Sequence, residues 1–209
     1  MTFGEMKALI ADDIARSDLT TQIAQAVLDA IQDQERTRFY FNERRDAPAF
    51  TTVAGQEFYT SADDADIATI AHIDDLALIY NSGRRLLTSQ TERWMEDQPS
   101  NTGFQGVPSD YSYLAKRIRL YPIPDAAYDV YMTGQIRLAA LSAAGDTNVW
   151  TEDANQLIRF AAKEKLYRHV IQDPQRADQM GAAAAMQRSM LLGESMKRGG
   201  QHRLKSTPF

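Results

Sequence analysis

The side chains best suited to bind a metal or transfer a proton in this sequence are three histidines. They are His72, His169 and His202, and they lie far apart along the chain. His169 falls in a predicted helix without a second histidine three or four residues away, the spacing that a helical zinc site uses. His72 falls in an apolar segment. We therefore interpret these histidines as ordinary core or surface residues and predict no metal site.

Two groups of aspartates offer carboxylate chemistry. Asp63, Asp64 and Asp66 resemble the start of a calcium-binding loop, but the central glycine and the final glutamate of such a loop do not follow. Asp74 and Asp75 are adjacent, so in a strand their side chains point to opposite faces and do not act as a pair. Both groups are interpreted as solvated acidic segments.

Enzyme motifs are missing from the sequence. It contains no G-x-G-x-x-G, no phosphate-binding loop and no G-x-S-x-G, and it has no cysteine to serve as a nucleophile or thiolate ligand. We predict that the protein is not an enzyme and uses no catalytic residue, metal or cofactor. A hydrolase with two catalytic carboxylates stays open as an alternative, because only the fold sets their spacing.

Four arginines lie close together near the end of the first quarter of the chain. Arg36, Arg38, Arg44 and Arg45 are interleaved with glutamates, which dilutes any positive patch. We interpret this segment as a salt-bridged helix end rather than a nucleic-acid site. The pairs Arg84-Arg85 and Lys116-Arg117 are interpreted as exposed positions.

The C-terminal end differs in charge from the rest of the chain. From Lys197 to Phe209 there are four lysine or arginine residues and no acid, whereas the whole chain has a formal charge of -5. Removing those four positive charges leaves -9 on residues 1–196. An acidic body of this kind argues against a large DNA-gripping surface. The basic end keeps nucleic-acid binding as a second alternative.

Composition is that of an ordinary globular protein. The chain has 209 residues, of which 44% are hydrophobic and 24% charged. This length suffices for one domain, or for one domain that carries an insertion. Apolar runs are too short to span a membrane, and the first residues lack the features of a secretory signal. Together with the lack of cysteine, this predicts synthesis and folding in a cytoplasm.

Apolar residues at helical spacing occur at both ends of the chain. Ser17 and Asp18 are candidate N-caps for the second helix, and Thr151 for the third. Asp173 followed by Pro174 is a typical start for the fourth helix. The predicted helices span residues 3–16, 19–42, 151–172 and 174–198.

The central part of the chain shows strand patterns instead. Pro48 and Gly55 punctuate β-branched and aromatic residues, which predicts a hairpin with its turn at Ala54-Gly55. Residues 67–81 fit either period over short stretches, and their β-branched and aromatic content favours a strand. The next segment is predicted as a strand that leads into a short helix over 89–97. Residues 111–138 alternate apolar and polar side chains, which favours a half-buried antiparallel β-meander.

These elements predict an α+β protein. A four-helix bundle-like domain is expected from residues 1–46 and 147–198, with an antiparallel β subdomain inserted at residues 47–146. Residues 199–209 are expected to form an extended C-terminal tail, because Gly199 and Gly200 end the last helix.

The last predicted helix is rich in alanine and methionine where a core helix normally uses leucine and isoleucine. Alanine allows close helix packing and methionine adapts to irregular partners. A closely packed helix pair, within the chain or between subunits, explains this composition. The candidate subunit-interface residues are Met180, Ala183, Ala184, Met186, Met190 and Leu191.

Three phrases in this order resemble the head-to-tail adaptor proteins of tailed bacteriophages, especially those of short-tailed phages. The first is FYFNERRDAPAFTTVAGQEFYT, at the second helix and first hairpin. The second is GVPSDYSYLAKRIRLYPIPDAAYDVYMTGQIRL, with its Gly-x-Pro-x-x-Tyr opening and LYPIP turn. The third is DTNVWTEDANQLIRFAAKEKLY, which enters the third helix. The similarity covers most of the chain.

The resemblance implies a structural protein of the virion, placed at the head–tail junction after synthesis in the host cytoplasm. Such adaptors form a ring, usually of twelve copies, beneath the portal protein of the filled head. The ring contacts tail or nozzle proteins, extends the DNA channel without specific DNA binding, and helps to retain the genome until ejection. No membrane contact and no catalysis are implied.

For this chain the resemblance assigns portal docking to the C-terminal tail. Its basic side chains would meet an acidic neighbour, and its apolar ones would act as anchors. The predicted docking residues are Lys197, Arg198, His202, Arg203, Leu204, Lys205 and Phe209. The alternatives remain a nucleic-acid-binding protein that uses this tail and a virion-associated cell-wall hydrolase.

Overall fold

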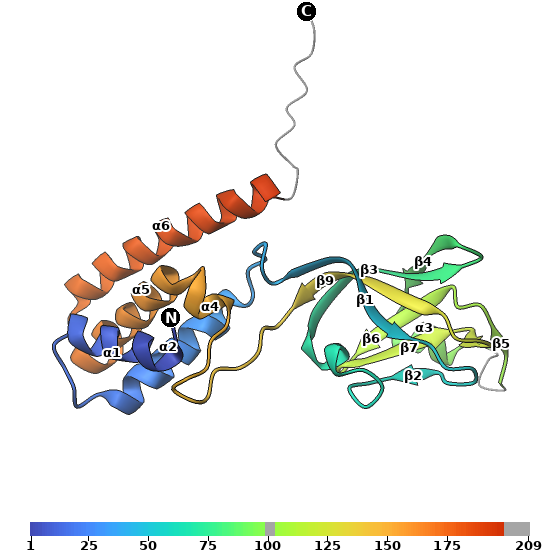
Figure 1. Ribbon diagram of the computed structural model, residues 1–209, viewed down its shortest axis with the longest axis horizontal. Coiled ribbons are helices and arrows are strands. Elements are labelled where there is room, and N and C mark those ends of the chain that lie inside the picture. Colours follow the sequence, from blue (N-terminus) through green and yellow to red (C-terminus); the bar gives the residue numbers. More distant parts are fainter. Residues whose placement is uncertain (99–102, 199–209) are drawn as a thin grey trace, which may run out of the picture. The chain divides into compact units, whose positions relative to one another are not determined.

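The polypeptide passes from one compact unit into a second and then returns to the first. Residues 1–42 and 138 onward form a helical unit, and Glu43–Arg137 form a β unit. The computed structural model describes residues 1–98 and 103–198 (Figure 1). The prediction of a mixed α+β protein is confirmed.

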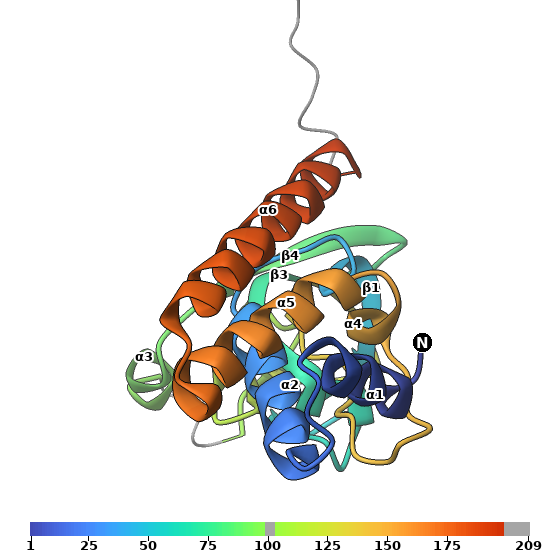
Figure 2. The same cartoon turned by 90° about the vertical axis from the view of Figure 1, so that its left-hand side faces the viewer.

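The helical unit is built from several short helices and one long C-terminal helix, α6, which lies along α5 on one side of the unit (Figure 2). Within the segment predicted as one helix over 151–172, α5 continues directly into a π-helical turn, η3, and the next residue, Gln172, has the left-handed conformation. The elements are α1 (Phe3–Asp13), α2 (Thr20–Gln34), α4 (Val149–Glu152), α5 (Asn155–Leu166), η3 (Tyr167–Ile171) and α6 (Pro174–Arg198).

The unit therefore differs from the predicted bundle of four regular helices. The single helix predicted for residues 151–172 is divided among α4, α5 and η3. The second helix ends at Gln34 rather than at residue 42. Its predicted C-terminal part forms a loop, in which Asn42 accepts a hydrogen bond from the Phe39 amide and donates one to the Thr37 carbonyl.

Two of the predicted helix N-caps, those for the second and third predicted helices, were wrong. Asn148 rather than Thr151 caps α4, and Thr151 occupies the reciprocal position of the capping box. Asp18 instead forms an ion pair with Arg16, at 2.7 Å. Asp173 caps α6 as predicted, since its carboxylate accepts a hydrogen bond from the Arg176 amide.

Small residues bring α6 close to α5. Ala177 and Ala184 are buried, and each lies about one turn from Gly181 on the same face of α6. A Cβ atom added at Gly181 would lie 3.1 Å from the carboxyl carbon of Glu164 on α5. The close helix pair that the alanine content suggested is thus present within the chain.

The β unit holds a sheet whose strand order, in the described part of the chain, is β1-β9-β3-β4-β6-β7-β2. A separate short pair joins β5 to β8. The strands are β1 (Glu43–Thr51), β2 (Phe58–Tyr59), β3 (Ile70–Tyr80), β4 (Gly83–Ser89), β5 (Gln105–Gly106), β6 (Asp110–Leu114), β7 (Arg117–Tyr121), β8 (Ile123–Pro124) and β9 (Asp129–Ile136), with helices η1 (Ala65–Thr69) and α3 (Glu92–Glu96) between them.

Element types in this unit match the sequence better than strand pairing does. The strand predicted for residues 67–81 is confirmed over Ile70–Tyr80, whereas residues 67–69 belong to η1. The strand and the helix that follow it are confirmed. The predicted hairpin at Ala54-Gly55 is wrong, because β1 pairs with β9 and β2 pairs with β7. The sheet is not wholly antiparallel, since β4 runs parallel to β6. The meander is limited to β6 and β7, and β9 crosses to the other side of the sheet.

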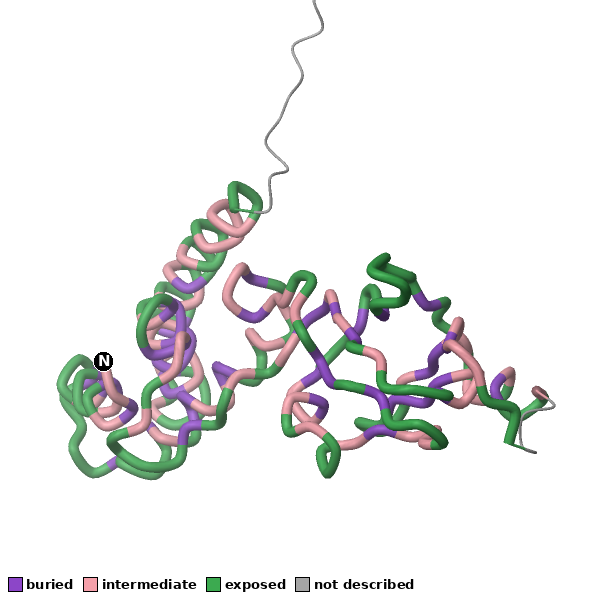
Figure 3. The backbone as a smooth tube through the Cα atoms, turned by 45° about the vertical axis from the view of Figure 1, so that its right-hand side comes forward, coloured by how far each residue is buried: buried purple, intermediate pink, exposed green. Residues whose placement is uncertain are grey.

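Each unit has its own apolar core, and buried residues gather inside both (Figure 3). Gly134 on β9 allows a close approach of β3, because an added Cβ atom would lie 2.2 Å from the His72 carbonyl oxygen. The helical core includes Phe3, Met6, Ile10, Ile23, Val27, Phe39, Trp150, Leu157, Ile158 and Leu166; the β core includes Phe50, Tyr59, Ile67, Leu76, Leu78, Tyr111, Ile118, Leu120, Val130 and Met132.

Candidate partner-binding surfaces

One side of α6 faces its own unit and the other faces outward. Of the six predicted interface residues, Ala184 is buried, and Met180 and Leu191 pack partly against the helical core. Met186 and Met190 remain 66% and 59% exposed. Met186 and Met190, together with Ala182 and Ala183 one turn before Met186, form an apolar stripe. We call this stripe the outer face of α6. Exposed apolar stripes of this kind are typical of protein-contact surfaces.

The C-terminal end of α6 is fastened to the loop that follows α2. The Tyr40 amide donates a 3.0 Å hydrogen bond to Ser195 Oγ, and the Arg198 guanidinium lies 3.8 Å from the centre of the Tyr40 ring. Arg188 donates a hydrogen bond to Thr37 Oγ1 in the same loop. The last turns of α6 therefore have a fixed position within the helical unit.

Tyr40 is held in its neutral form by its surroundings. Its hydroxyl donates a 2.7 Å hydrogen bond to Asp153 Oδ2. Burial and this hydrogen bond raise the pKa of Tyr40 to about 12. At neutral pH the hydroxyl remains a donor, so this contact persists over the ordinary pH range.

Beside Tyr40, an aromatic cluster fills the end of the helical core. Phe39 and Phe41 stack with ring centres 5.3 Å apart, and both meet the edge or face of Trp150 at close to a right angle. Trp150 is fully buried. The cluster explains why α2 stops early: the aromatic residues pack across the chain on Trp150 rather than along a helix.

Two predicted docking residues are in the described part of the chain. Lys197 and Arg198 are exposed in the last turn of α6, and Arg198 pairs with Glu194 one turn earlier. The other five, His202, Arg203, Leu204, Lys205 and Phe209, lie outside the described residues.

One groove, of about 610 Å³, lies between α2, α5 and α6, and another, of about 410 Å³, lies in the β unit. The groove in the helical unit carries charges of both signs, and most are paired. Lys165 lies 2.7 Å from Asp33, and Arg168 lies 3.1 Å from both Glu164 and Asp178. These pairs join helices, and they leave a polar seam rather than a set of reactive groups.

A second ion-pair group joins α1 to α5. Asp13 Oδ2 accepts hydrogen bonds from Arg159 and Lys163, at 2.7 and 3.0 Å. Partial burial acts to raise the pKa of Asp13, but the bonds from Lys163 and Arg159 outweigh it and hold that pKa below its ordinary value. This carboxylate acts as a link between helices.

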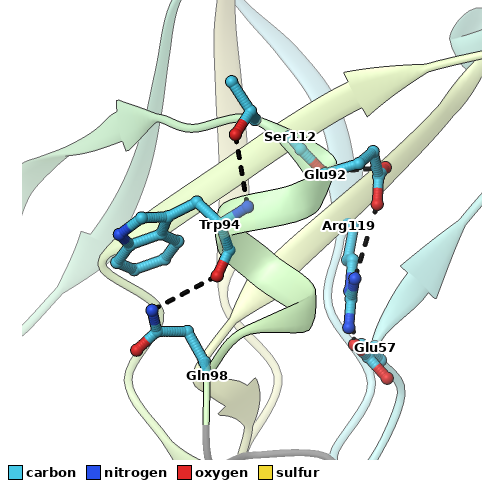
Figure 4. A network of polar contacts seen from close by, with 7 residues as sticks. Glu57, Glu92, Trp94, Gln98, Ser112 and Arg119 are labelled. Carbon is cyan, nitrogen blue, oxygen red and sulfur yellow. Dashed lines mark hydrogen bonds and ion pairs between the residues drawn. The ribbon is translucent and has the colours of Figure 1, made fainter.

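The β unit contains a buried arginine with two acidic partners. Arg119 is 6% exposed and lies between Glu57 and Glu92, as Figure 4 shows. Its Nε lies 2.5 Å from Glu57 and its Nη1 lies 3.4 Å from Glu92, which also accepts a hydrogen bond from Ser112. We call these four residues the Arg119 cluster. It ties β6 and β7 to α3 and to the segment before β2.

A protein-family model described as SU10 adaptor protein matches residues 1–206. The chain belongs to this SU10 adaptor protein family. A search of curated proteins finds no match. The family is one of bacteriophage structural adaptors, so the protein is a component of a virion. The resemblance to phage adaptors is thereby confirmed.

In this SU10 adaptor protein, the three aspartates that resembled the start of a calcium-binding loop, Asp63, Asp64 and Asp66, have local structural roles. The carboxylate of Asp63 accepts a 2.8 Å hydrogen bond from the Thr60 amide, which is the main reason that its pKa is lowered. Asp64 caps η1, and Asp66 pairs with Arg44 at 2.6 Å. Within residues 1–98 and 103–198, no group of three or more acidic or histidine side chains is placed to hold a metal ion.

Two of the four clustered arginines of this SU10 adaptor protein form ion pairs, as predicted, but at a different place in the fold. Arg44 and Arg45 are ion-paired, with Asp66 and Glu43. They lie on β1, however, rather than at a helix end. The two pairs Arg84-Arg85 and Lys116-Arg117 are exposed, as predicted.

Sequence reasoning missed the Arg119 cluster and the aromatic cluster. Alternation placed Arg119 on the solvent side of its strand, but Glu57 and Glu92 cover that side. Glu57 and Glu92 lie in segments of mixed polar and apolar residues far apart in the sequence, so no local pattern marked them as partners of Arg119. Across the described helices, none is both long and apolar enough to cross a membrane.

Proposed function

We propose that this phage adaptor forms a ring beneath the portal protein and joins the DNA-filled head to the tail. The observation that carries the proposal is the family match over residues 1–206. It is supported by an apolar helix face that the chain itself leaves exposed. Following the resemblance, the ring has twelve copies, the phage is of the short-tailed type, and the head–tail junction is the site.

A ring requires two different adhesive patches on every subunit, because each copy contacts its neighbours through unlike surfaces. The outer face of α6 is one such patch. Met186 and Met190 lie one turn apart on it, and both are more than half exposed. Burying two methionine side chains would contribute about 3 kcal/mol or more to each contact.

Portal docking is assigned to the last turn of α6 and the basic segment beyond it. Lys197 and Arg198 are exposed at the end of a helix whose final turns are fastened to Tyr40. A fixed helix end gives the following segment a defined starting point. Tail or nozzle proteins are the proposed partners of the β unit.

DNA passes through the ring without specific binding in this proposal. The whole chain has a formal net charge of -5, and residues 197–209 contribute four positive charges. Residues 1–196 therefore have a formal net charge of -9. A channel wall with excess negative charge repels phosphate and allows DNA to slide. Specific DNA binding would require a basic footprint instead.

The test is to mix the purified protein with its cognate portal protein and to examine the product by electron microscopy. A ring on the portal is expected, with copy number from native mass spectrometry. The variant Met186→Glu/Met190→Glu should lose the ring while keeping its circular dichroism spectrum. Gln175→Glu, an exposed change on the same helix outside the stripe, is the matched control. Persistent monomers of the unaltered protein with no portal binding would overturn the proposal.

A further inference from the structure

The β3–β4 hairpin of the β unit ends in an arm with one open backbone edge. Asn81 and Ser82 form a two-residue turn, both with positive φ of 50° and 61°, and Tyr80 pairs with Gly83 across it. Beyond the turn, β4 pairs with β6 only at Thr88 and Ser89. In the described part of the chain, the edge of residues 83–87 opposite β3 is therefore unpaired. Figure 1 shows this hairpin projecting at the β4 label.

The direction of the backbone groups on this edge follows from the strand period. The Thr88 amide donates to the Ser109 carbonyl, on the side of β6. Successive residues of a strand alternate in the side to which their N–H and C=O point. Leu86 and Arg84 therefore direct theirs to the same side as Thr88, where they are available to a strand from another molecule.

Side chains on the arm are apolar and basic. Leu86 is 62% exposed and Ile79 is 38% exposed. Arg84 pairs with Asp46, and Arg85 is exposed on the next position. An open edge with a large exposed leucine is a surface that proteins normally protect or use.

A groove of opposite charge lies on the same unit. It has a volume of about 410 Å³, follows β1 and reaches η1, and includes Asp64, Asp66 and Asp129. Apolar surface is supplied by Pro48 and Tyr131. The groove thus offers carboxylates and an apolar wall beside an edge strand of the sheet.

We propose that the arm of one copy lies in the acidic groove of the next copy. Arg85 then faces the carboxylates of the groove while Arg84 keeps its pair with Asp46, and Leu86 contacts Pro48 or Tyr131. The contact joins two unlike surfaces, as a ring requires. A two-fold pairing of two arms is disfavoured because it would set arginines against arginines. The inference rests on the proposed function in one respect, that the neighbour is the next copy in the ring.

The distance between Pro48 and Leu86 within one copy allows a disulfide test to distinguish contacts between copies from contacts within one copy. Pro48, Tyr131, Ala77 and Leu86 are consecutive partners across β1, β9, β3 and β4. At about 4.8 Å per strand, Pro48 and Leu86 are roughly 14 Å apart in one copy. A disulfide needs Cα atoms within about 7 Å, so a bond between these positions joins two copies. The natural chain has no cysteine to interfere.

The experiment uses the full chain with Leu86→Cys/Pro48→Cys, assembled on the portal and oxidised. A ladder of covalent oligomers on a denaturing gel is expected, and each single variant should stop at a dimer or monomer. Leu86→Cys/Leu114→Cys, with a second exposed cysteine on β6, is the matched control and should give no ladder. A ring visible by microscopy without a ladder overturns the arm contact and leaves the proposed function intact. The absence of any ring overturns the proposed function itself.

A charge exchange gives an independent measurement. Arg85→Glu and Asp129→Lys should each weaken assembly roughly tenfold, because each sets like charges against one another. The two changes together should restore most of it, since the attraction is regained with its sign reversed. Sedimentation velocity measures the extent of assembly of each variant, and low and high salt show how much of it depends on charge. Equal assembly of all variants would contradict the proposal, and binding of duplex DNA that Arg85→Glu alone removes would assign the arm to DNA instead.

Discussion

The helical unit and the β unit use charge in different ways. In the helical unit, ion pairs such as Lys165 with Asp33 lie at the surface and join helices whose packing is otherwise apolar. In the β unit, a guanidinium is buried between two carboxylates inside the fold. The difference teaches that the helices are held mainly by an apolar core, whereas the short strands of the β unit also depend on a buried ionic link.

The largest expected effect tests the apolar side of this comparison. Trp150→Ala should lower the free energy of unfolding by about 3–5 kcal/mol, because it opens a cavity beneath Phe39 and Phe41. Urea unfolding followed by circular dichroism at 222 nm measures the loss. Trp150→Phe keeps most of the packing and should cost clearly less. Equal losses in the two variants would show that the cluster is not a packed core.

Removal of the buried arginine tests the ionic side. Arg119→Ala should destabilise the β unit by about 3 kcal/mol, the lower end of the range for a broken buried pair, because Glu57 and Glu92 keep 24% and 18% exposure. Arg117→Ala, an exposed neighbour on the same strand, is the control. Hydrogen exchange should become faster in β6 and β7 while α2 and α5 keep their protection. Uniform acceleration in both units would break the distinction between them.

The small residues of α6 allow a sharper comparison within the helical unit. A Cβ atom added at Gly193 meets nothing within 4 Å, so Gly193→Ala should stabilise the protein by about 1 kcal/mol through helix propensity. Gly181→Ala should stabilise it less, because the new methyl group lies 3.1 Å from the Glu164 carboxyl carbon. Thermal unfolding of the two variants measures the difference. A larger gain at Gly181 would show that α6 is not tightly packed there.

The smallest effect concerns the partly buried link between Asp13 and its two basic partners. Its pKa is lower in the folded than in the unfolded protein, so its contribution to stability is present above the unfolded value of about 3.9 and is lost as pH falls through the folded value. Asp13→Asn should cost at most about 1 kcal/mol at pH 7, since the side chain is 35% exposed. Urea titrations from pH 7 to pH 3 should show the variant and the natural protein converging. Asp12→Asn is the exposed control, and a gap that widens in acid would contradict this account.

Local pattern was sufficient for the identity of most elements. The α6 start at Asp173 and Pro174, the strand over residues 70–80 and the strand and helix after it all follow from caps and periodicity. These signals lie within a few residues of the structure that they predict, because a helix cap or a strand alternation is satisfied by near neighbours.

Long-range contacts decided the remainder. The loop after Gln34 depends on Trp150, more than a hundred residues later, and β1 pairs with β9 rather than with β2. The candidate sites show the same division. Sequence alone located the alanine- and methionine-rich helix and the exposed Arg84 and Arg85, but only the tertiary structure separated buried Ala184 from exposed Met186. Burial and strand pairing depend on which distant segment arrives as a neighbour, and no short window of sequence contains that information.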